Sequence, residues 1–314
     1  MATYNGARFL RAQLDSIAAQ ARPPDELVVC DDGSTDATVA IAEAFAREAP
    51  FPVRVERNPQ RLGAHQNFAR ALARCAGNAV AFADQDDIWL PAKLGRLLAA
   101  MEDGDAAFAF CDARLIAEDG TPLRGRTLLD RRFPLDAIAR AFAPGGRPLP
   151  LMLKRDFIYG TTLVFDASLR EALLPVPDGW SHDTWVVNML VLLGERGAAV
   201  LEPLVLYRQH GVQASGGMTA PKRVPYATQL AAYEALRERA LAVAPALGRS
   251  VAPADLALLD EKIRYLRALV EIERLPLHRR AAPIARELLS GRWRRYSPRV
   301  FRIRPRWRIG PGAA

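Results

Sequence analysis

Three carboxylates stand within four residues at Asp84-Gln85-Asp86-Asp87, the sharpest chemical signal in the sequence. Carboxylates this close repel one another unless a cation offsets their charge. Mg²⁺ and Mn²⁺ take oxygen ligands, and one or two carboxylates can hold such an ion while a diphosphate supplies further oxygens. A solvated loop that caps the next helix would explain one aspartate but not three. We therefore expect a cation and a diphosphate here, with Mg²⁺ or Mn²⁺ as the cofactor.

A second acidic turn, Asp31-Asp32-Gly33-Ser34-Thr35-Asp36, follows a short apolar run and precedes a helical pattern. A carboxylate in this turn would accept hydrogen bonds from a nucleoside base or from ribose hydroxyls. The same residue types are equally typical of a capped turn, in which Asp and Ser accept bonds from helix N–H groups. Both interpretations stay open from this string alone.

Two further strings place polar groups at the ends of predicted elements. Asp183, in His182-Asp183-Thr184-Trp185, stands at a helix start, where a carboxylate is more typical of a cap. Its functional alternative is a general base that deprotonates a hydroxyl. Arg208 and His210 lie two residues apart in an extended stretch and would share a face, where both would meet phosphate oxygens. A single histidine is more often a surface residue, or a residue whose hydrogen bonds are made within the protein, than a ligand-binding residue.

Alternating strands and helices position these strings. Apolar runs predict strands at 26–30, 53–56, 79–83, 106–111 and 161–165, with an extended return at 198–209. Helical spacing predicts helices from Asp36 and at 64–75, 91–101 and 182–194. This order indicates an α/β fold with a doubly wound, mostly parallel sheet, whose ligands bind beyond the carboxyl ends of the strands. Both acidic loops follow strands, so we expect them to meet at one crevice.

The remaining segments are less regular. Residues 112–160 are rich in Pro and Gly and are expected to be loops that line or cover the site, and a helical hairpin is predicted from 225 to about 275. The chain opens on Met1-Ala-Thr-Tyr-Asn-Gly6, a turn-like string that enters a helix directly. A doubly wound sheet normally begins with a strand, so we expect the first strand to be missing.

Composition bounds the class of protein. The chain has 314 residues, of which 50% are hydrophobic and 25% charged, which excludes a disordered, collagenous or coiled-coil protein. The net charge of +8 is concentrated at residues 279–314, where 11 arginines face the single acid Glu287, so the rest of the chain is slightly acidic. Cys30, Cys75 and Cys111 fit free thiols, and no apolar run reaches the ~18 residues of a membrane span. We expect a cytoplasmic protein that touches a membrane surface.

In this order and spacing, the motifs resemble those of the family 2 glycosyltransferases with the GT-A fold, within them the bacterial cell-surface polysaccharide and rhamnosyltransferase-like enzymes. The matching strings are MATYNG (1–6), DDGSTD (31–36), N-P-x-R-x-G-x-x-x-N-F (58–68), DQDDIW (84–89), HDTW (182–185) and YRQHG (207–211). The resemblance covers residues 1–218, which it implies are the catalytic domain. Residues 219–314 would then be a helical extension that ends in the basic, Arg- and Trp-rich tail 279–314.

The resemblance implies an inverting transfer from a nucleoside-diphosphate sugar to a hydroxyl of a glycan or lipid-linked acceptor. The similarity of the motifs to those of the rhamnosyltransferase-like group suggests dTDP-rhamnose as the donor. The roles that the resemblance assigns are nucleotide-sugar binding for Thr3, Tyr4, Asn5, Asp32, Asn67, Asp84, Arg208 and His210, metal binding for Asp86 and Asp84, catalysis for Asp183, and an acceptor-side position for His182 and Trp185. For Asp183, the resemblance favours the base over the cap.

Two other functions compete with this interpretation. A sugar-1-phosphate nucleotidyltransferase also combines an α/β sheet with acidic metal ligands, but residues 1–30 lack the Gly-rich, basic phosphate loop that such an enzyme normally carries. A non-catalytic protein would use the basic tail, in which Trp293, Tyr296, Phe301 and Trp307 alternate with arginines. That pattern suits nucleic acid or an anionic membrane. We favour the membrane, and nucleic acid is the less expected partner.

Overall fold

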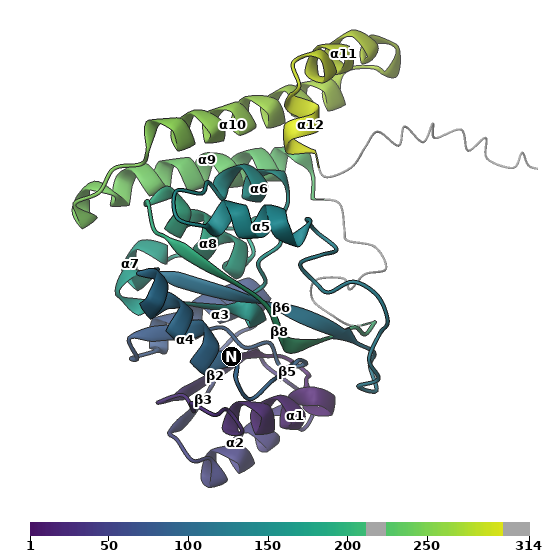
Figure 1. The fold of residues 1–314 in the computed structure, drawn as a ribbon. Helices are drawn as coiled ribbons and strands as arrows, with labels where there is room; N and C mark the ends of the chain where they lie inside the picture. The colour runs from purple at the N-terminus through teal and green to yellow at the C-terminus, as the bar shows by residue number, and fades with distance from the viewer. Residues whose placement is uncertain (212–223, 298–314) are drawn as a thin grey trace, which may run out of the picture.

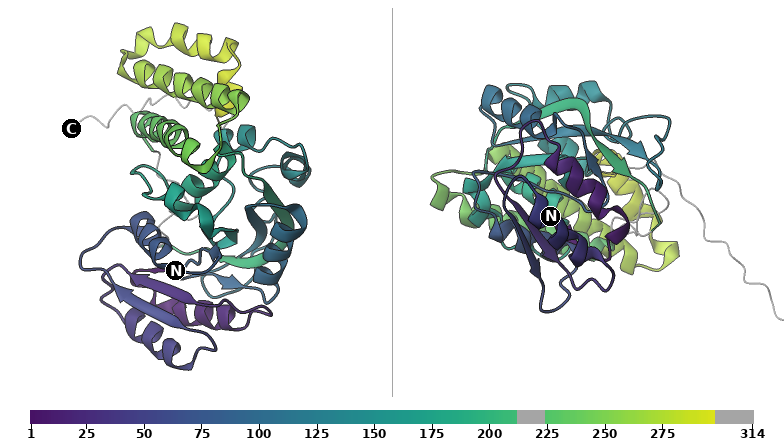
Figure 2. Two further views of the ribbon diagram at one scale, coloured as in Figure 1. Left: turned by 90° about the vertical axis from the view of Figure 1, so that its left-hand side faces the viewer. Right: turned by 90° about the horizontal axis from the view of Figure 1, so that it is seen from below.

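A computed structural model describes residues 1–211 and 224–297 of the chain. It contains two sheets flanked by helices, and a helical layer that covers one end (Figure 1). Figure 2 shows this layer at the end of the molecule opposite to the first sheet. The α/β fold expected from the sequence is confirmed, and no helix in the described part of the chain is long and apolar enough to cross a bilayer.

The first sheet has three parallel strands in the order β1 (Ala2–Thr3), β2 (Leu27–Asp31) and β3 (Val53–Arg57). Every residue of β2 is buried, as expected of a central strand in a parallel sheet. The helices of this half are α1 (Ala7–Ala18), α2 (Thr38–Glu48) and α3 (Ala64–Arg74). Leu10, Leu14 and Ile17 of α1 recur at helical spacing and are all buried.

The expectation that the first strand is missing is wrong. Ala2 and Thr3 form β1, which pairs with Cys30 and Asp31 of β2. The amino group of Met1 also donates a hydrogen bond to the carbonyl of Val28 at 2.8 Å. A two-residue strand is too short to produce a periodic pattern, so no local pattern predicts it.

The second sheet is mixed rather than mostly parallel. Its strand order is β4-β7-β6-β8-β5, and of its pairings only β6 with β8 is parallel. The strands are β4 (Ala79–Ala81), β5 (Ile88–Trp89), β6 (Phe108–Ile116), β7 (Leu163–Asp166) and β8 (Gly197–Arg208). The mostly parallel arrangement therefore holds for β1–β3 but not for the sheet as a whole.

Helices surround the second sheet, and two of them lie in the region predicted as loops. They are α4 (Lys93–Gly104), α5 (Leu135–Phe142), α6 (Leu149–Lys154), α7 (Arg170–Leu173) and α8 (His182–Leu192). Short helices such as α5 and α6 span too few turns to show a clear period beside Pro and Gly, which explains why they were missed. Almost every residue of α8 is buried, because it lies between the second sheet and the helical layer (Figure 1).

The helical layer contains the hairpin expected from the sequence. Its helices are α9 (Tyr226–Val243), α10 (Pro253–Arg274), α11 (Ala281–Leu289) and α12 (Arg292–Tyr296). Leu236 of α9 and Leu266 of α10 belong to the same buried cluster as Phe108 of β6 and Leu190 of α8. The layer therefore shares one core with the sheet. The predicted domain boundary at 218 falls outside the described residues and stays a prediction.

Two aromatic residues of the basic tail are packed rather than free to stack on a ligand. Tyr296 is buried, and its hydroxyl donates to the carbonyl of Leu258 at 3.2 Å. Its ring and that of Trp293 both lie against Tyr265 of α10. The expectation of an exposed aromatic and arginine surface is therefore wrong for Tyr296, whereas Trp293 is half-buried. Phe301 and Trp307 lie outside the described residues.

Candidate functional site

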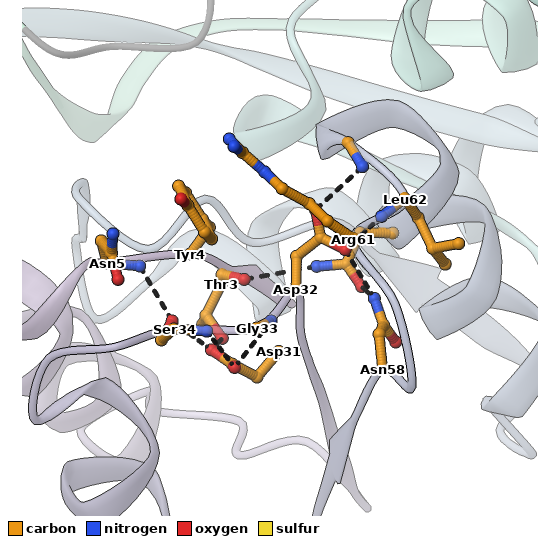
Figure 3. Close-up of polar contacts among 12 residues, drawn as sticks. Thr3, Tyr4, Asn5, Asp31, Asp32, Gly33, Ser34, Asn58, Arg61 and Leu62 are labelled. Atoms are coloured by element: carbon orange, nitrogen blue, oxygen red, sulfur yellow. Dashed lines mark hydrogen bonds and ion pairs between the residues drawn. The ribbon is translucent and has the colours of Figure 1, made fainter.

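The turn that follows β2 is capped by Asp31. Its carboxylate accepts hydrogen bonds from the hydroxyl of Thr3 at 2.9 Å and from the amides of Ser34 at 2.8 Å and Gly33 at 3.1 Å (Figure 3). Gly33 has φ +86°, a conformation that side chains rarely adopt. The capped-turn interpretation of this acidic string thus holds for Asp31, and the cap ties the ends of β1 and β2 together.

Asp32 fastens a second loop to this turn. It is buried, and its oxygens accept hydrogen bonds from the side-chain amide of Asn58 at 2.9 Å and from the backbone amides of Leu62 at 2.7 Å and Gly63 at 2.8 Å. Asn67 continues the network, since it accepts from Asn58 at 2.9 Å and donates to the carbonyl of Cys30 at 2.8 Å. Asp32 and Asn67 thus hold the turn and the loop 58–63 together. Their expected contacts with a nucleotide stay predictions.

Tyr4 and Asn5 lie at the mouth of this turn. Asn5 adopts φ 45° and is held by its amide, which donates to the hydroxyl of Ser34 at 2.8 Å, and by its side-chain oxygen, which accepts from the amide of Thr35 at 2.9 Å. The guanidinium of Arg61 lies 3.9 Å from the centre of the Tyr4 ring (Figure 3). Arg61 was not among the predicted site residues, although it is the arginine of the 58–68 motif.

Gln85 joins this turn to the acidic loop. Its side chain accepts from the amide of Tyr4 at 2.9 Å and donates to the carbonyl of the same residue at 3.1 Å. A Cβ at Gly6 would lie 2.1 Å from Oε1 of Gln85, so only glycine allows this approach. The expected convergence of the two acidic loops is thereby confirmed. Sequence reasoning missed Gln85, whose place between two aspartates was the available signal.

The three aspartates of the acidic loop differ in their surroundings. Asp87 is buried and accepts the backbone amide of Arg208 at 2.9 Å, so it fastens the loop to the end of β8. Asp84 and Asp86 are partly exposed and side by side at the site. Burial, with the charges of Asp86 and Asp183, raises the pKa of Asp84 to about 8. Without a cation, the ionised form of Asp84 is therefore disfavoured, and a cation beside it would stabilise that form.

The donor set fits a hard divalent cation with open coordination positions. Asp84 and Asp86 offer carboxylate oxygens, and Nε2 of His210 lies 2.7 Å from Oδ2 of Asp86. Among the described residues, no group of three acidic, histidine or cysteine side chains is arranged around one metal position. A cation here would take its other ligands from substrate and water, as Mg²⁺ commonly does.

Asp183 stands in the first turn of α8, and its charge acts on Asp84 of the acidic loop. Its carboxylate accepts hydrogen bonds from the amides of Gly160 at 2.9 Å and Thr184 at 2.7 Å. Burial alone would raise the pKa of Asp183, but His182 and these hydrogen bonds outweigh burial and lower it. The group is therefore ionised at neutral pH, as a general base must be, and it lies within electrostatic reach of Asp84.

His182 and Trp185 do not line an open surface as expected. His182 is 6% exposed, and its ring stacks on Phe68 at 3.8 Å and meets Phe82 edge-on at 4.7 Å. Burial lowers the pKa of His182 to about 4, so the ring is neutral at pH 7. Trp185 is fully buried and donates to the carbonyl of Leu173 at 2.7 Å. Both side chains, which lie within two residues of Asp183 in the sequence, are therefore packed in the protein interior.

Arg208 and His210 are fastened to the acidic loop. Nε of Arg208 donates to the carbonyl of Asp86 at 2.8 Å, and Nη1 donates to the carbonyl of Glu118 at 2.9 Å. With His210 beside the Asp86 carboxylate, the end of β8 supports the loop from one side. Their expected contact with a leaving diphosphate stays a prediction.

Comparison with known proteins identifies the family of the chain. Residues 1–160, about half of the chain, match the profile described as Glycosyl transferase family 2. The chain belongs to this family. A dTDP-rhamnosyl transferase, RfbG of Shigella flexneri, is 35% identical over 214 residues, which cover 67% of this chain and 71% of that protein. TuaG of Bacillus subtilis, a putative teichuronic acid biosynthesis glycosyltransferase, is 36% identical over 123 residues, 38% of this chain and 48% of that protein.

The family match does not extend over the whole of every relative. An uncharacterized protein of Mycobacterium bovis is 27% identical over 211 residues, and the chain spans 57% of its length. Two solved structures share the fold. S. aureus TarS 1–349 in complex with UDP-GlcNAc superposes with a TM-score of 0.59 at 16% identity, covering 88% of this family 2 chain and 75% of TarS. The mannosyltransferase PcManGT of Pyrobaculum calidifontis, in complex with GDP-Man and Mn²⁺, superposes with a TM-score of 0.54 at 23% identity, covering 92% and 74%.

Proposed function

We propose that the chain is an inverting glycosyltransferase that moves a sugar from a nucleoside-diphosphate donor to a hydroxyl of a cell-surface glycan or lipid-linked acceptor. The observation that carries this proposal is the position of an ionised Asp183 within electrostatic reach of the Asp84 and Asp86 pair. A base and an acidic diphosphate-binding loop on one crevice are the two groups that a single displacement at a sugar carbon needs.

The proposed reaction is one step at the anomeric carbon. Asp183 takes the proton of the acceptor hydroxyl as its oxygen forms the new bond to that carbon. The bond from the carbon to the diphosphate oxygen breaks on the opposite face, and its electron pair leaves with the nucleoside diphosphate. Attack opposite to the leaving group inverts the configuration. The acceptor oxygen must therefore lie between Asp183 and the sugar.

A divalent cation, Mg²⁺ or Mn²⁺, would be held by Asp84 and Asp86, where it would offset the charge on the departing diphosphate. The raised pKa of Asp84 supports this assignment, because burial and the charges of Asp86 and Asp183 disfavour its ionised form, which a bound cation would stabilise. The backbone around Thr3, Tyr4 and Asn5 would contact the nucleotide, with Tyr4 and Arg61 offering a ring and a guanidinium beside the turn. Similarity to RfbG supports dTDP-rhamnose as the first donor to test.

A thermal-shift screen tests the donor half of this proposal. We expect one nucleoside diphosphate, with Mn²⁺, to raise the melting temperature of the protein more than Mn²⁺ or the nucleotide alone, because ligands that bind the native state stabilise it. Matched screens with ADP, GDP, UDP, CDP and dTDP identify the base. A flat response to all five nucleotides would contradict a nucleotide site at the turn of residues 3–6.

We also propose that the segment 277–289 rests on an anionic membrane surface on the cytoplasmic side. Leu277 and Leu289 are 80% and 89% exposed, and Arg279 and Arg286 stand in the same segment. Exposed leucines beside arginines are the combination that binds anionic lipid headgroups and the upper acyl region. The three cysteines of the chain are free thiols, which supports a reducing compartment.

Flotation with liposomes that contain phosphatidylglycerol tests this surface. We expect the wild-type protein to float and the double variant Leu277→Gln, Leu289→Gln to float several-fold less, because two apolar contacts are lost. Leu123→Gln, at another exposed leucine, is the matched control and should float like the wild type. Equal flotation of the wild type and the double variant would show that this segment does not bind the membrane. If an RNA competitor blocked flotation, nucleic acid would be the favoured partner.

A further inference from the structure

A short 3-10 turn connects the proposed base to the acidic loop. The turn is η1 (Gly160–Thr162), which directly precedes β7. Gly160 donates its amide hydrogen to the Asp183 carboxylate at 2.9 Å. Thr161 is fully buried, and its hydroxyl oxygen accepts the indole N–H of Trp89 at 3.2 Å. Two consecutive residues therefore contact the proposed base on one side and the strand that follows the acidic loop on the other.

Trp89 is fixed relative to the acidic loop. It stands in β5, two residues after Asp87, and is buried. Its backbone amide donates to the hydroxyl of Ser16 at 3.0 Å. Strand β5 pairs with β8, whose last residue, Arg208, donates its amide hydrogen to Asp87 at 2.9 Å. The indole therefore cannot shift without a shift of the loop that carries the proposed metal ligands.

The Thr161 side chain also acts on the loop itself. A hydroxyl that accepts one hydrogen bond still has its own hydrogen to donate. Burial raises the pKa of Asp87 well above its usual value, and the Thr161 side chain is one of the groups that oppose this rise. Thr161 therefore lies beside both ends of the segment 87–89.

The neighbouring Thr162 makes a different contact. It is equally buried, but its hydroxyl donates to the carbonyl of Tyr159 at 2.7 Å, within the same short segment. The bond between Thr161 and Trp89 instead joins residues 72 positions apart in the chain. Thr162 thus offers a buried hydroxyl of the same type that does not link the two halves of the site.

We propose that Thr161 is a positioning residue that fixes the separation between the base Asp183 and the acidic loop. In the proposed displacement, the acceptor oxygen and the departing diphosphate lie on opposite faces of one carbon. The base and the loop that binds the diphosphate must therefore keep a defined separation, and a misplacement of about 1 Å can lower a rate about a hundredfold. Thr161 is buried, so it acts through Gly160 and Trp89 and does not touch the substrate. This inference rests on the proposed function, because it concerns the geometry of the same site.

The kinetics of Thr161→Val test this role. Valine keeps the branched shape of threonine but cannot accept the indole N–H. We expect kcat to fall at least about tenfold while the KM for the nucleotide sugar changes less than about twofold, because the residues proposed to bind the donor keep their own contacts. Thr161→Ser retains the hydroxyl and should restore most of kcat.

The matched control is Thr162→Val, which removes a hydroxyl at the same degree of burial. Its kcat should stay within about twofold of the wild type, because its hydroxyl bonds only within its own segment. Equal losses of kcat in Thr161→Val and Thr162→Val, or no recovery in Thr161→Ser, would overturn the positioning role.

Trp89→Phe removes the same hydrogen bond from the other side, so the test does not depend on the folding of one variant. It should lower kcat to a similar extent, and the double variant with Thr161→Val should lose little more than either single variant. In the Asp183→Asn background, Thr161→Val should change the residual rate less than about twofold, because a residue that acts through the base has no effect once the base is absent. Additive losses in either combination would overturn the proposal.

The nucleotide thermal shift separates this inference from the proposed function. Thr161→Val and Trp89→Phe should keep the wild-type shift with nucleoside diphosphate and Mn²⁺. Loss of the shift in both would show that the bond builds the nucleotide site, and would overturn a role in positioning the base. A wild-type protein that transfers no sugar would contradict the proposed function and this inference together. Sugar transfer that Thr161→Val leaves unchanged would contradict this inference alone.

Discussion

Replacing Asp183 by asparagine should abolish sugar transfer while nucleotide binding persists. The amide keeps the size of the carboxylate, and its oxygen can still accept the Gly160 amide, which the carboxylate accepts at 2.9 Å. It cannot take a proton from the acceptor, and loss of a general base lowers rates by about 10²–10⁴. The measurement is nucleoside diphosphate release from the donor that the thermal screen identifies.

The matched control for this experiment is Asp178→Asn, which makes the same chemical change at an exposed position. It should turn over like the wild type. The thermal shift with nucleotide and Mn²⁺ should be equal for all three proteins, which shows that the site is folded. Transfer by Asp183→Asn at a rate near that of the wild type would remove Asp183 as the base.

Removal of divalent cations should produce the second large loss. We expect excess EDTA to lower transfer at least about a hundredfold, because stabilisation of the leaving diphosphate by a metal contributes several kcal/mol. Added Mn²⁺ should restore the rate, which is the control against damage to the protein. Asp84→Asn should reduce the rate similarly and should not be rescued by ordinary Mn²⁺ concentrations. Undiminished activity in excess EDTA would contradict the assignment of Asp84 and Asp86.

The acidic loops were predictable because their aspartates are close together in the sequence. Carboxylates that accumulate where a strand ends are visible in the sequence, and the rule that parallel strands direct their carboxyl ends to one edge brings such loops together. The structure confirms this convergence through the hydrogen bonds of Gln85 to Tyr4. Gln85 itself was missed because its partner is 81 residues away, and no local pattern encodes that separation.

The surroundings of Asp183 were less predictable. Helix α8 is buried on nearly all sides, so its sequence has no polar face to indicate which side chains reach the site. His182 and Trp185 therefore looked available to an acceptor, whereas the structure packs them behind the base. The hydrogen bond from the Gly160 amide to the Asp183 carboxylate was also not predicted from the sequence. A Cβ at position 160 would lie 2.7 Å from Nε2 of His182, so glycine is required there for a tertiary reason.

The basic tail shows the limit of reasoning from composition. The positions of its arginines show correctly where the net positive charge of the chain lies. Their alternation with aromatic residues, however, suggested that the aromatic side chains are exposed, whereas Tyr296 is buried. A tyrosine between arginines can belong to the core when a short helix turns one face inward, as α12 does against α10. The exposed large apolar residues of the segment 277–289 are instead leucines, at positions 277, 288 and 289.

The products of the reaction test the central claim most directly. Wild-type protein, Mn²⁺ and a panel of nucleotide sugars that includes dTDP-rhamnose should release nucleoside diphosphate, at a rate that rises when a glycan acceptor is added. The parallel mixture contains nucleoside triphosphates and sugar 1-phosphates. If that mixture released pyrophosphate and no nucleotide sugar released nucleoside diphosphate, the protein would be a nucleotidyltransferase and the account given above would be contradicted.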